Sequence, residues 1–347
     1  MAATPIVFAV RGSVRDGLGH VMRCRAVAEE LARLQVDLRL LVLGDDSSRA
    51  LLRHTGLSHE YCESDAALVD KVNESCADCV VFDMLSFDES CFDRIKSRCI
   101  TISLSPVFNC MDRVEHLFHR TIHDDPRWRE LNHFPTVHKG FEYAIISERC
   151  HRIPGPVYRS HVKRSPLSIA ISMGGSDAPN RTLSVLNELK KASCSLLIWV
   201  ALGEAYTHSY EDLVAAVRGT KHEVILIKSN ESMWRVLQGS CVLICSSGLT
   251  PYEAAFVGLP SIILPERQEG LFLVRELEEK GACRILPSGA DGMLDLRRLI
   301  EEWEADRSVI QAYHDAAIKL IKAHGTRRVA RAIKRLAKLV RQRIPAS

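Results

Sequence analysis

The chain has 347 residues, of which 46% are hydrophobic and 26% charged, and its formal net charge at pH 7 is +3. A chain of this length and composition buries a sizeable core and exceeds the usual size of one domain, so we expect two domains and no extended disorder. No stretch approaches the roughly 18 to 20 consecutive apolar residues of a membrane-spanning helix, and the N-terminus lacks the features of a signal peptide, so we expect a cytoplasmic protein.

Short apolar runs alternate with helical patterns along the first half of the chain. This alternation predicts a parallel, doubly wound α/β sheet. The apolar runs lie at 5–10, 37–43, 79–83 and 99–104, and helical patterns lie at about 20–33 and 47–54.

Residues 151–165 are rich in proline and basic side chains, which neither a strand nor a helix tolerates well, so we predict a linker there. The α/β alternation then restarts. The sequence therefore predicts a Rossmann-like domain over 1–150, a second one over 166–325 and a basic amphipathic helix over 326–347.

Positive charge and cysteine follow simple patterns. Residues 327–343 carry eight Lys and Arg and no acidic residue, which leaves a net charge of −5 on the rest of the chain. Basicity confined to one segment argues against a nucleic-acid-binding protein.

The twelve cysteines are scattered along the chain, which is typical of reduced thiols and not of a disulfide framework. The CxxC at Cys76 and Cys79 has no partner pair, so we predict no zinc site.

A first candidate loop is RGSVRDGLGHVMR at 11–23. Gly17 and Gly19 allow a sharp turn close to a ligand, and His20 falls at the start of the next helix, whose free N–H groups attract anions. An imidazole there is suited to act as a general base or to orient water. A plain tight turn with His20 as a helix cap is the alternative, and this loop alone leaves both open.

A second glycine loop follows the first strand expected in the second half, in the sequence AISMGGSDAPNRT. Gly174, Gly175 and Ser176 lie there before a helix expected from about Asn180. The arrangement suits a phosphate group, although a single Gly-Gly pair is a weak signal.

A third loop, in CVLICSSGLTPYEAAFVGLPSIILP, places Ser246, Ser247 and Gly248 before a helix that has Pro251 in its first turn. Glu253 would accept both hydroxyls of a ribose whose phosphates lie at this turn. Compensation of the helix dipole is its other possible role. All three loops follow expected strands, and open α/β sheets bind ligands at the carboxyl ends of their strands.

These loops resemble those of the UDP-sugar hydrolases of the pseudaminic acid pathway, which release UDP from a diacetamido-trideoxy-altropyranose. That chemistry belongs to the biosynthesis of sialic-acid-like sugars for cell-surface polysaccharides. The chain is more distantly similar to MurG-like glycosyltransferases. The resemblance implies a GT-B fold, in which two Rossmann-like domains face a cleft. The stretches that carry it are 11–23, GFEYAIISE at 140–148, ISMGGSDAPN at 171–180 and SSGLTPYEAAFVGLPSIILPERQ at 246–268.

The resemblance also implies roles for single residues. His20 would position or activate the attacking water, with no cofactor and no metal ion. The residues expected to bind the nucleotide sugar are Arg11, Gly17, Gly19, Gly174, Gly175, Ser176, Ser246, Ser247, Gly248, Glu253, Arg267 and Gln268.

Two positions depart from the family pattern. The hydrolases have a Tyr two residues after the acid that corresponds to Asp83, where this chain has Leu85, and an Asn where it has Arg267. Arg267 suits a diphosphate or a carboxylate, or is a solvated charge beside two glutamates. The substrate's sugar is therefore left open.

The histidine-rich stretch HLFHRTIHDDPRWRELNH at 116–133 suggests a metal site at first sight. Its Asp-Asp-Pro turn breaks the helical spacing of the histidines, so a loop over the cleft or an ordinary surface is favoured.

Three functions fit this sequence: a hydrolase of UDP-sugars, a glycosyltransferase with a lipid, saccharide or small-molecule acceptor, and a non-catalytic sensor. The sensor is the least favoured because it would not need His20. In the basic helix, Val329 and Ile333 fall on one face and Arg328 and Arg331 on the other. We expect its apolar face to pack on the first domain, and membrane contact is the less favoured alternative.

Overall fold

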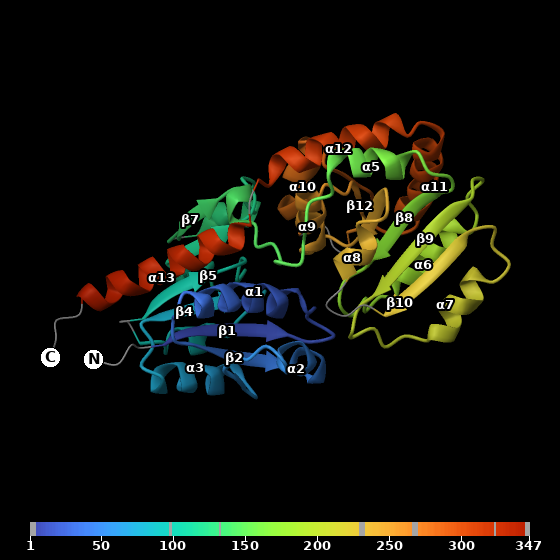
Figure 1. Ribbon diagram of the computed structural model, residues 1–347. Helices are drawn as coiled ribbons and strands as arrows, with labels where there is room; N and C mark the ends of the chain where they lie inside the picture. The colour runs from blue at the N-terminus through green and yellow to red at the C-terminus, as the bar shows by residue number, and fades with distance from the viewer. Residues whose placement is uncertain are drawn as a thin grey trace. The chain divides into compact units, whose positions relative to one another are not determined.

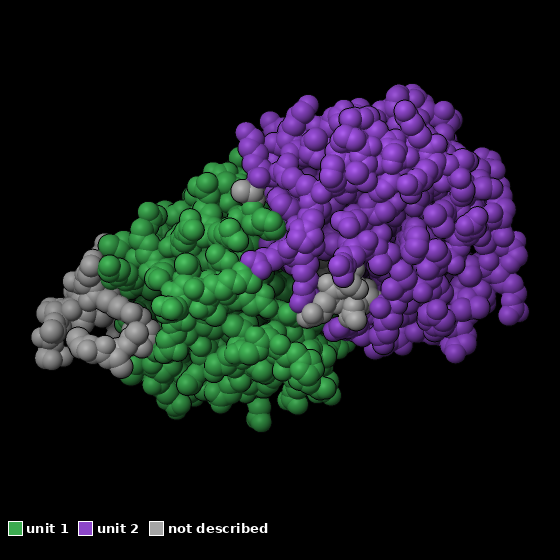
Figure 2. All heavy atoms as spheres, in the orientation of Figure 1, with its two compact units in different colours: residues 1–145, 324–347 green, residues 146–323 purple. Residues whose placement is uncertain are grey.

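The computed structural model describes residues 5–96, 99–131, 133–228, 233–265, 270–322 and 324–343. Two parallel α/β units make up this part of the chain (Figure 1). Unit 1 comprises residues 1–145 and 324–347, and unit 2 comprises residues 146–323 (Figure 2). The predicted fold class, two Rossmann-like α/β domains, is confirmed.

Unit 1 is built on a parallel sheet in the order β3-β2-β1-β4-β5-β6-β7. Its central strands β1 and β4 are almost entirely buried, because helices cover both faces of such a sheet. The strands are β1 (Ile6–Gly12), β2 (Leu38–Gly44), β3 (His59–Tyr61), β4 (Cys79–Asp83), β5 (Ile100–Ser103), β6 (His116–His119) and β7 (Thr136–Lys139).

The helices of unit 1 follow its strands and use short polar caps where they start in solvent, such as Asp45 before α2 and Ser64 before α3. They are α1 (Gly19–Arg33), α2 (Asp46–Leu52), α3 (Asp65–Glu74), α4 (Glu89–Phe92) and α13 (Gly325–Arg343), with 3₁₀ turns η1 (Met111–Arg113), η2 (Pro126–Glu130) and η3 (Phe141–Tyr143).

The C-terminal helix α13 completes the core of unit 1. Its residues Val329, Ala330, Ile333 and Ala337 are buried in one cluster with the apolar face of α1, and the two helices lie side by side in Figure 1. The expected packing of this helix on the first domain is confirmed. No helix in the described ranges is long and apolar enough to cross a membrane.

Unit 2 repeats the arrangement with a sheet in the order β10-β9-β8-β11-β12-β13. Its central strand β8 is buried throughout. The strands are β8 (Leu167–Ser172), β9 (Leu196–Leu202), β10 (Glu223–Lys228), β11 (Val242–Cys245), β12 (Ser261–Ile263) and β13 (Cys283–Ile285). The helices are α5 (Gly155–Val162), α6 (Arg181–Leu189), α7 (Tyr210–Val217), α8 (Met233–Leu237), α9 (Thr250–Val257), α10 (Phe272–Glu279), α11 (Ala290–Ala305) and α12 (Ser308–Leu320).

The strand order fixes where each unit can bind a ligand. Successive strands are added toward one edge of the sheet up to β3 and toward the other edge from β4 in unit 1, and the same change occurs between β10 and β11 in unit 2. The strand order therefore switches at the parallel pairs β1–β4 and β8–β11. At such a switch point the loops leaving the two strands diverge, and the space between them is where open α/β sheets take up ligands. The first predicted loop follows β1, the second follows β8 and the third follows β11.

Two parts of the sequence prediction need correction. Helix α5 lies inside the range predicted to hold neither helix nor strand, because Pro154 and Pro156 fall at its start, where a missing N–H costs nothing, and because Tyr158 and Val162 are buried. The short strands β3, β6 and β7 were not predicted, and the first histidines of the 116–133 stretch lie in β6.

Candidate functional site

His20 is the second residue of α1, and its ring points to the neighbouring strand end. The ring atom Nδ1 lies 2.6 Å from Oδ1 of Asp83, the last residue of β4. Asp83 is fully buried, while 12% of the His20 side chain is exposed. The two residues therefore meet at the switch point of unit 1, with the ring reaching toward the surface.

This contact determines which nitrogen of His20 carries the proton. A carboxylate oxygen at 2.6 Å is an acceptor, so Nδ1–H must donate to it and the neutral ring keeps its lone pair on Nε2. The alternative in which His20 caps the helix is not supported, because the cap position of α1 is Leu18 and no side chain caps it. His20 thus has the tautomer that a general base at Nε2 requires.

Arg23 and Ser105 complete the network around Asp83, and the sequence did not predict either. Arg23 donates through Nε to Oδ2 at 2.6 Å and through Nη2 to Oδ1 at 2.5 Å, and the Ser105 hydroxyl donates to Oδ1 at 2.7 Å. Burial by itself raises the pKa of Asp83, but the charges and hydrogen bonds of Arg23 and His20 outweigh it and hold that pKa well below its usual range. The spacing of His20 and Arg23, three residues apart on one helix, was the available signal.

The rest of the first loop shapes the turn before α1. Gly17 has φ +86°, a conformation that favours glycine, and its N–H donates to the carbonyl of Ser13. Gly19 has open space where a Cβ would lie, so sterics do not demand glycine there. Arg11 donates through Nη2 to Asp65 of α3 at 2.5 Å, and its buried Nε has no hydrogen-bond partner.

The second loop is filled by its own acid. Both carboxylate oxygens of the buried Asp177 accept the N–H groups of Arg181 and Thr182, at 2.8 and 2.9 Å, and so cap α6. The start of α6 is therefore not open to a phosphate, as the loop's shape had suggested, because a carboxylate already occupies it. The backbone at Gly174 (φ +94°) and Gly175, and the buried Ser176, lie just before this cap.

The third loop leads to an open helix start. The cap position of α9 is Leu249, whose side chain makes no capping hydrogen bond, and Pro251 lies in its first turn. Ser246 and Ser247 are partly exposed and Gly248 is exposed. A Cβ built on Gly174 would lie 3.7 Å from the Ser246 hydroxyl oxygen, so the second and third loops meet at the switch point of unit 2.

Glu253 lies in the first turn of α9 and already accepts hydrogen bonds within unit 2. Its donors are the Ser147 backbone N–H, the Trp234 side chain and the Cys150 thiol, while burial raises the pKa of the carboxyl. These bonds tie α9 to α8 and to the segment before α5. A ribose would have to share the carboxylate with them, which is geometrically possible because a carboxylate has about four acceptor positions.

Other sequence candidates lie elsewhere. Arg267 and Gln268 are outside the described residues. Leu85 is 44% exposed and follows the buried Met84 after β4. In the 116–133 stretch, His119 is buried, and its Nε2 lies 2.7 Å from the carbonyl of His123. Among the described residues, no three or more His, Cys, Asp or Glu side chains are grouped to hold a metal ion.

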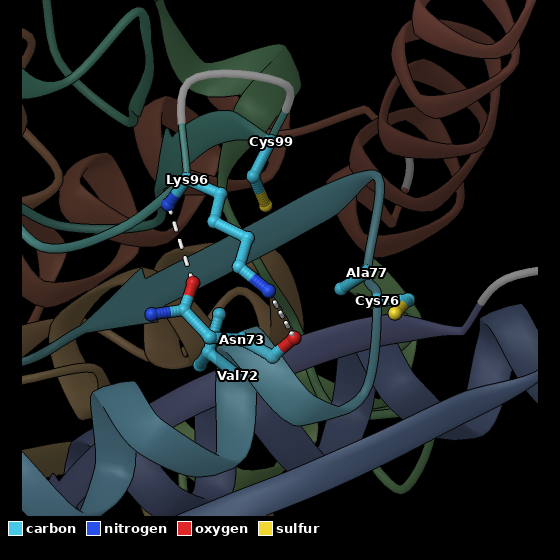
Figure 3. A pocket seen from close by; sticks show the side chains of 6 residues that line it. All are labelled: Val72, Asn73, Cys76, Ala77, Lys96 and Cys99. Atoms are coloured by element: carbon cyan, nitrogen blue, oxygen red, sulfur yellow. Dashed lines mark hydrogen bonds between the residues drawn. The ribbon is translucent and has the colours of Figure 1, made fainter.

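A small pocket in unit 1 is not part of this site. Figure 3 shows that it lies where α3 ends and where β4 and β5 begin, which is the amino edge of the sheet, whereas His20 and Asp83 lie at the carboxyl edge. The pocket is lined by Val72, Asn73, Cys76, Ala77, Lys96 and Cys99.

Two parallel-sheet α/β units with these strand orders form the architecture of GT-B glycosyltransferases. The chain superposes on MurG of Acinetobacter baumannii with a TM-score of 0.64 at 14% identity, covering 97% of this chain and 99% of that one. It superposes on a putative UDP-N-acetylglucosamine 2-epimerase of Listeria monocytogenes with a TM-score of 0.66 at 12% identity, covering 100% and 99%. For the glycosyltransferase VinC in complex with dTDP, the TM-score is 0.61 at 12% identity, covering 96% and 100%.

No protein-family model matches the chain. An uncharacterized protein of Methanocaldococcus jannaschii is 23% identical over 266 residues, which are 74% of this chain and 54% of that protein. The match thus spans about half the length of this curated relative.

Proposed function

We propose that this protein is a nucleotide-sugar hydrolase that cleaves the anomeric C–O bond of a UDP-linked deoxy-amino sugar and releases UDP. The observation that carries the proposal is the His20 ring, whose Nδ1–H is held by Asp83 so that Nε2 is available to accept a proton. A binding protein would have no use for a buried acid that fixes a titratable ring in the tautomer of a base.

In the proposed reaction, the oxygen of a water molecule bonds to the anomeric carbon as the bond from that carbon to the diphosphate oxygen breaks. One proton of the water passes to His20 Nε2, and the electron pair of the broken bond leaves with UDP. A positioned base of this kind accelerates a reaction by about 10²- to 10⁴-fold. His20 then returns the proton to solvent and regains its lone pair.

We assign the nucleotide to unit 2, at the start of α9. The side chain of its cap residue Leu249 makes no capping hydrogen bond, and the backbone N–H groups that precede Pro251 suit the negative charge of a diphosphate and the charge that develops on departing UDP. Ser246, Ser247 and Gly248 lie before these groups, Gly174 lies beside Ser246 and is followed by Gly175, and Glu253 is the proposed ribose acceptor.

A glycosyltransferase is the second candidate. The solved structures that share this fold include glycosyltransferases over nearly their whole length. In addition, the exposed Leu85 stands where the similar hydrolases have a Tyr, which changes the surface next to the proposed base. In this second reaction an acceptor hydroxyl, not water, would give its proton to His20.

One experiment separates these functions. The protein is incubated with a panel of UDP-sugars, with and without saccharide and lipid acceptors, and free UDP is measured. UDP release in water alone, with ¹⁸O from labelled water in the sugar product, supports hydrolysis. Release only with an acceptor would favour the transferase, and binding by calorimetry without any release would favour a sensor.

A further inference from the structure

We propose that Arg23 is a positioning residue that holds Asp83 so that His20 keeps its lone pair on Nε2. The inference rests on the proposed function only for its effect on rate. Its effect on the ring of His20 is a property of the folded protein and can be measured without a substrate.

Arg23 orients the carboxylate of Asp83. Arg23 binds both oxygens of Asp83, through Nε and Nη2, and both side chains are buried. The flat guanidinium fork fixes the plane of the carboxylate, which a single ammonium group does not do. The orientation of that plane directs Oδ1 at His20 Nδ1.

Arg23 also supplies a positive charge beside the buried carboxyl of Asp83. Asp83 has no exposed surface, and a buried carboxyl without a cation tends to keep its proton. A protonated Asp83 could donate to Nδ1, and the ring would then carry its own proton on Nε2. The positive charge of Arg23 therefore favours the form of Asp83 that only accepts.

Arg23 also lies close to the His20 ring. Nη2 of Arg23 lies 2.9 Å from His20 Nδ1, and both atoms are directed at the same oxygen of Asp83. While Arg23 Nη2–H and His20 Nδ1–H both donate to Oδ1 of Asp83, neither can accept from the other. Asp83 thus prevents a hydrogen bond from Arg23 to His20 Nδ1. If Asp83 turned away, Arg23 would become the donor to Nδ1 and the ring would lose its free Nε2.

The test is nitrogen NMR of the full chain labelled with ¹⁵N-histidine, with the His20 signals assigned by their loss in His20→Gln. In the wild type, the neutral His20 ring should be in the Nδ1–H form. In Arg23→Gln the population of this form should fall substantially, and in Arg23→Lys, which keeps the charge but not the fork, it should fall less. Arg25→Gln is the matched control, because Arg25 is a buried arginine of the same helix that bonds Glu29 and Leu51.

Turnover gives the second readout. Arg23→Gln should lower kcat for UDP release by about 10- to 100-fold, the scale of a misplaced catalytic group, with little change in UDP affinity. Arg25→Gln should leave kcat near the wild-type value. A wild-type tautomer population in Arg23→Gln would overturn the inference. If that variant does not fold, a wild-type tautomer and kcat in Arg23→Lys would overturn it equally.

The two proposals fail separately. If the wild type releases no UDP while the tautomer still shifts in the Arg23 variants, the positioning role stands and the hydrolase proposal falls. If UDP is released and the tautomer does not respond to Arg23, the hydrolase proposal stands and the positioning role falls.

Discussion

The switch points of the two sheets share a strand order but differ in what their buried aspartates do. In unit 1, Asp83 ends β4 and receives His20 and Arg23, so the acid is part of a proton-accepting arrangement. In unit 2, Asp177 follows β8 and caps α6, so both of its carboxylate oxygens already accept N–H groups of that helix. At the start of α9 the cap residue is Leu249, whose side chain makes no capping hydrogen bond, and we assign the anion to this helix start.

A glycine loop before a helix is an incomplete signal for phosphate. Both loops of unit 2 contain glycine and serine, and both lead into a helix at the carboxyl edge of the sheet. At α6, an internal carboxylate already accepts the first N–H groups of the helix, so the glycine loop before it does not leave them to a phosphate. Variants of unit 1 should therefore change turnover, while variants at the start of α9 should change nucleotide affinity.

The largest effect is expected for His20→Ala. Removing the proposed base should lower the rate of UDP release by about 10²-fold or more while UDP affinity stays unchanged. Initial rates of UDP release, with calorimetric UDP binding as control, check this expectation. Near-wild-type turnover would remove His20 from the chemistry.

Glu253→Ala tests the other side of the comparison. Loss of a charged hydrogen bond to ribose should weaken UDP binding by about 1 to 3 kcal/mol, measured by calorimetry. Because the carboxylate also accepts from Ser147, Trp234 and Cys150, thermal unfolding must be followed in parallel. Glu253→Gln keeps the size of the side chain and serves as the matched variant. Unchanged UDP affinity in a folded Glu253→Ala protein would take this residue out of the site.

Gly248→Asp converts the open start of α9 into one like that of α6. A Cβ on Gly248 meets no atom within 4 Å, so the first carbon of the new side chain has room. Its charge beside a diphosphate should reduce UDP affinity by about 10-fold, since two like charges near a protein surface repel by roughly 1 to 4 kcal/mol at 4 Å. Gly248→Asn has the same shape without the charge and should bind UDP nearly as well as the wild type. Equal losses in both variants would contradict an anion site at this helix.

The smallest expected effect concerns the stability of the protein in acid, and it comes from His119 in unit 1. Burial lowers the pKa of His119 to about 4, whereas in the unfolded chain the group has the ordinary value of 6.5. Between these values the unfolded chain binds a proton that the folded chain does not, so stability should fall as pH drops from about 6.5 to about 4. His119→Gln keeps a donor for the His123 carbonyl and removes the titration.

The expected difference is a smaller fall of the unfolding temperature with acid in His119→Gln. Each kcal/mol of stability changes this temperature by roughly 1 to 2 °C, given an unfolding entropy of about 2.1 cal/mol/K per residue. Thermal unfolding followed at pH 4, 5, 6 and 7 in both proteins measures it. Parallel curves would mean that His119 does not carry the acid sensitivity.

Much of the fold could be predicted from the sequence because buried strands leave continuous apolar runs and amphipathic helices leave periodic patterns. The strands around β1, β4 and β8 and the packing of α13 on the first unit belong to this class. Strands β3 and β7 were missed because their sequences, HEY and TVHK, contain no apolar run, whereas the equally short β5 lies within one. Helix α5 was missed because its prolines lie in its first turn, where they are harmless, while they count against a helix in composition.

At the candidate site, the sequence predicted His20 but not its neighbours. Asp83 and Arg23 are separated by 60 residues, and their contact depends on β1 and β4 being adjacent in the sheet. Likewise, the capping role of Asp177 depends on backbone geometry, with φ +45° at Asp177 and +52° at Asn180, which composition does not reveal. Local sequence patterns therefore located the loops, but the roles of Asp83 and Asp177 could be assigned only from the folded structure.

The return of α13 to unit 1 has a consequence for how the protein is made. A ribosome delivers α1 early and α13 only after all of unit 2, which is one continuous stretch of chain. While unit 2 is being synthesised, the apolar face of α1 lacks the Val329, Ala330 and Ile333 side chains that bury it. A chaperone that binds exposed apolar surface would therefore find its target in the part of the chain made first, and a chain that stops after unit 2 would lose support for the helix that carries His20.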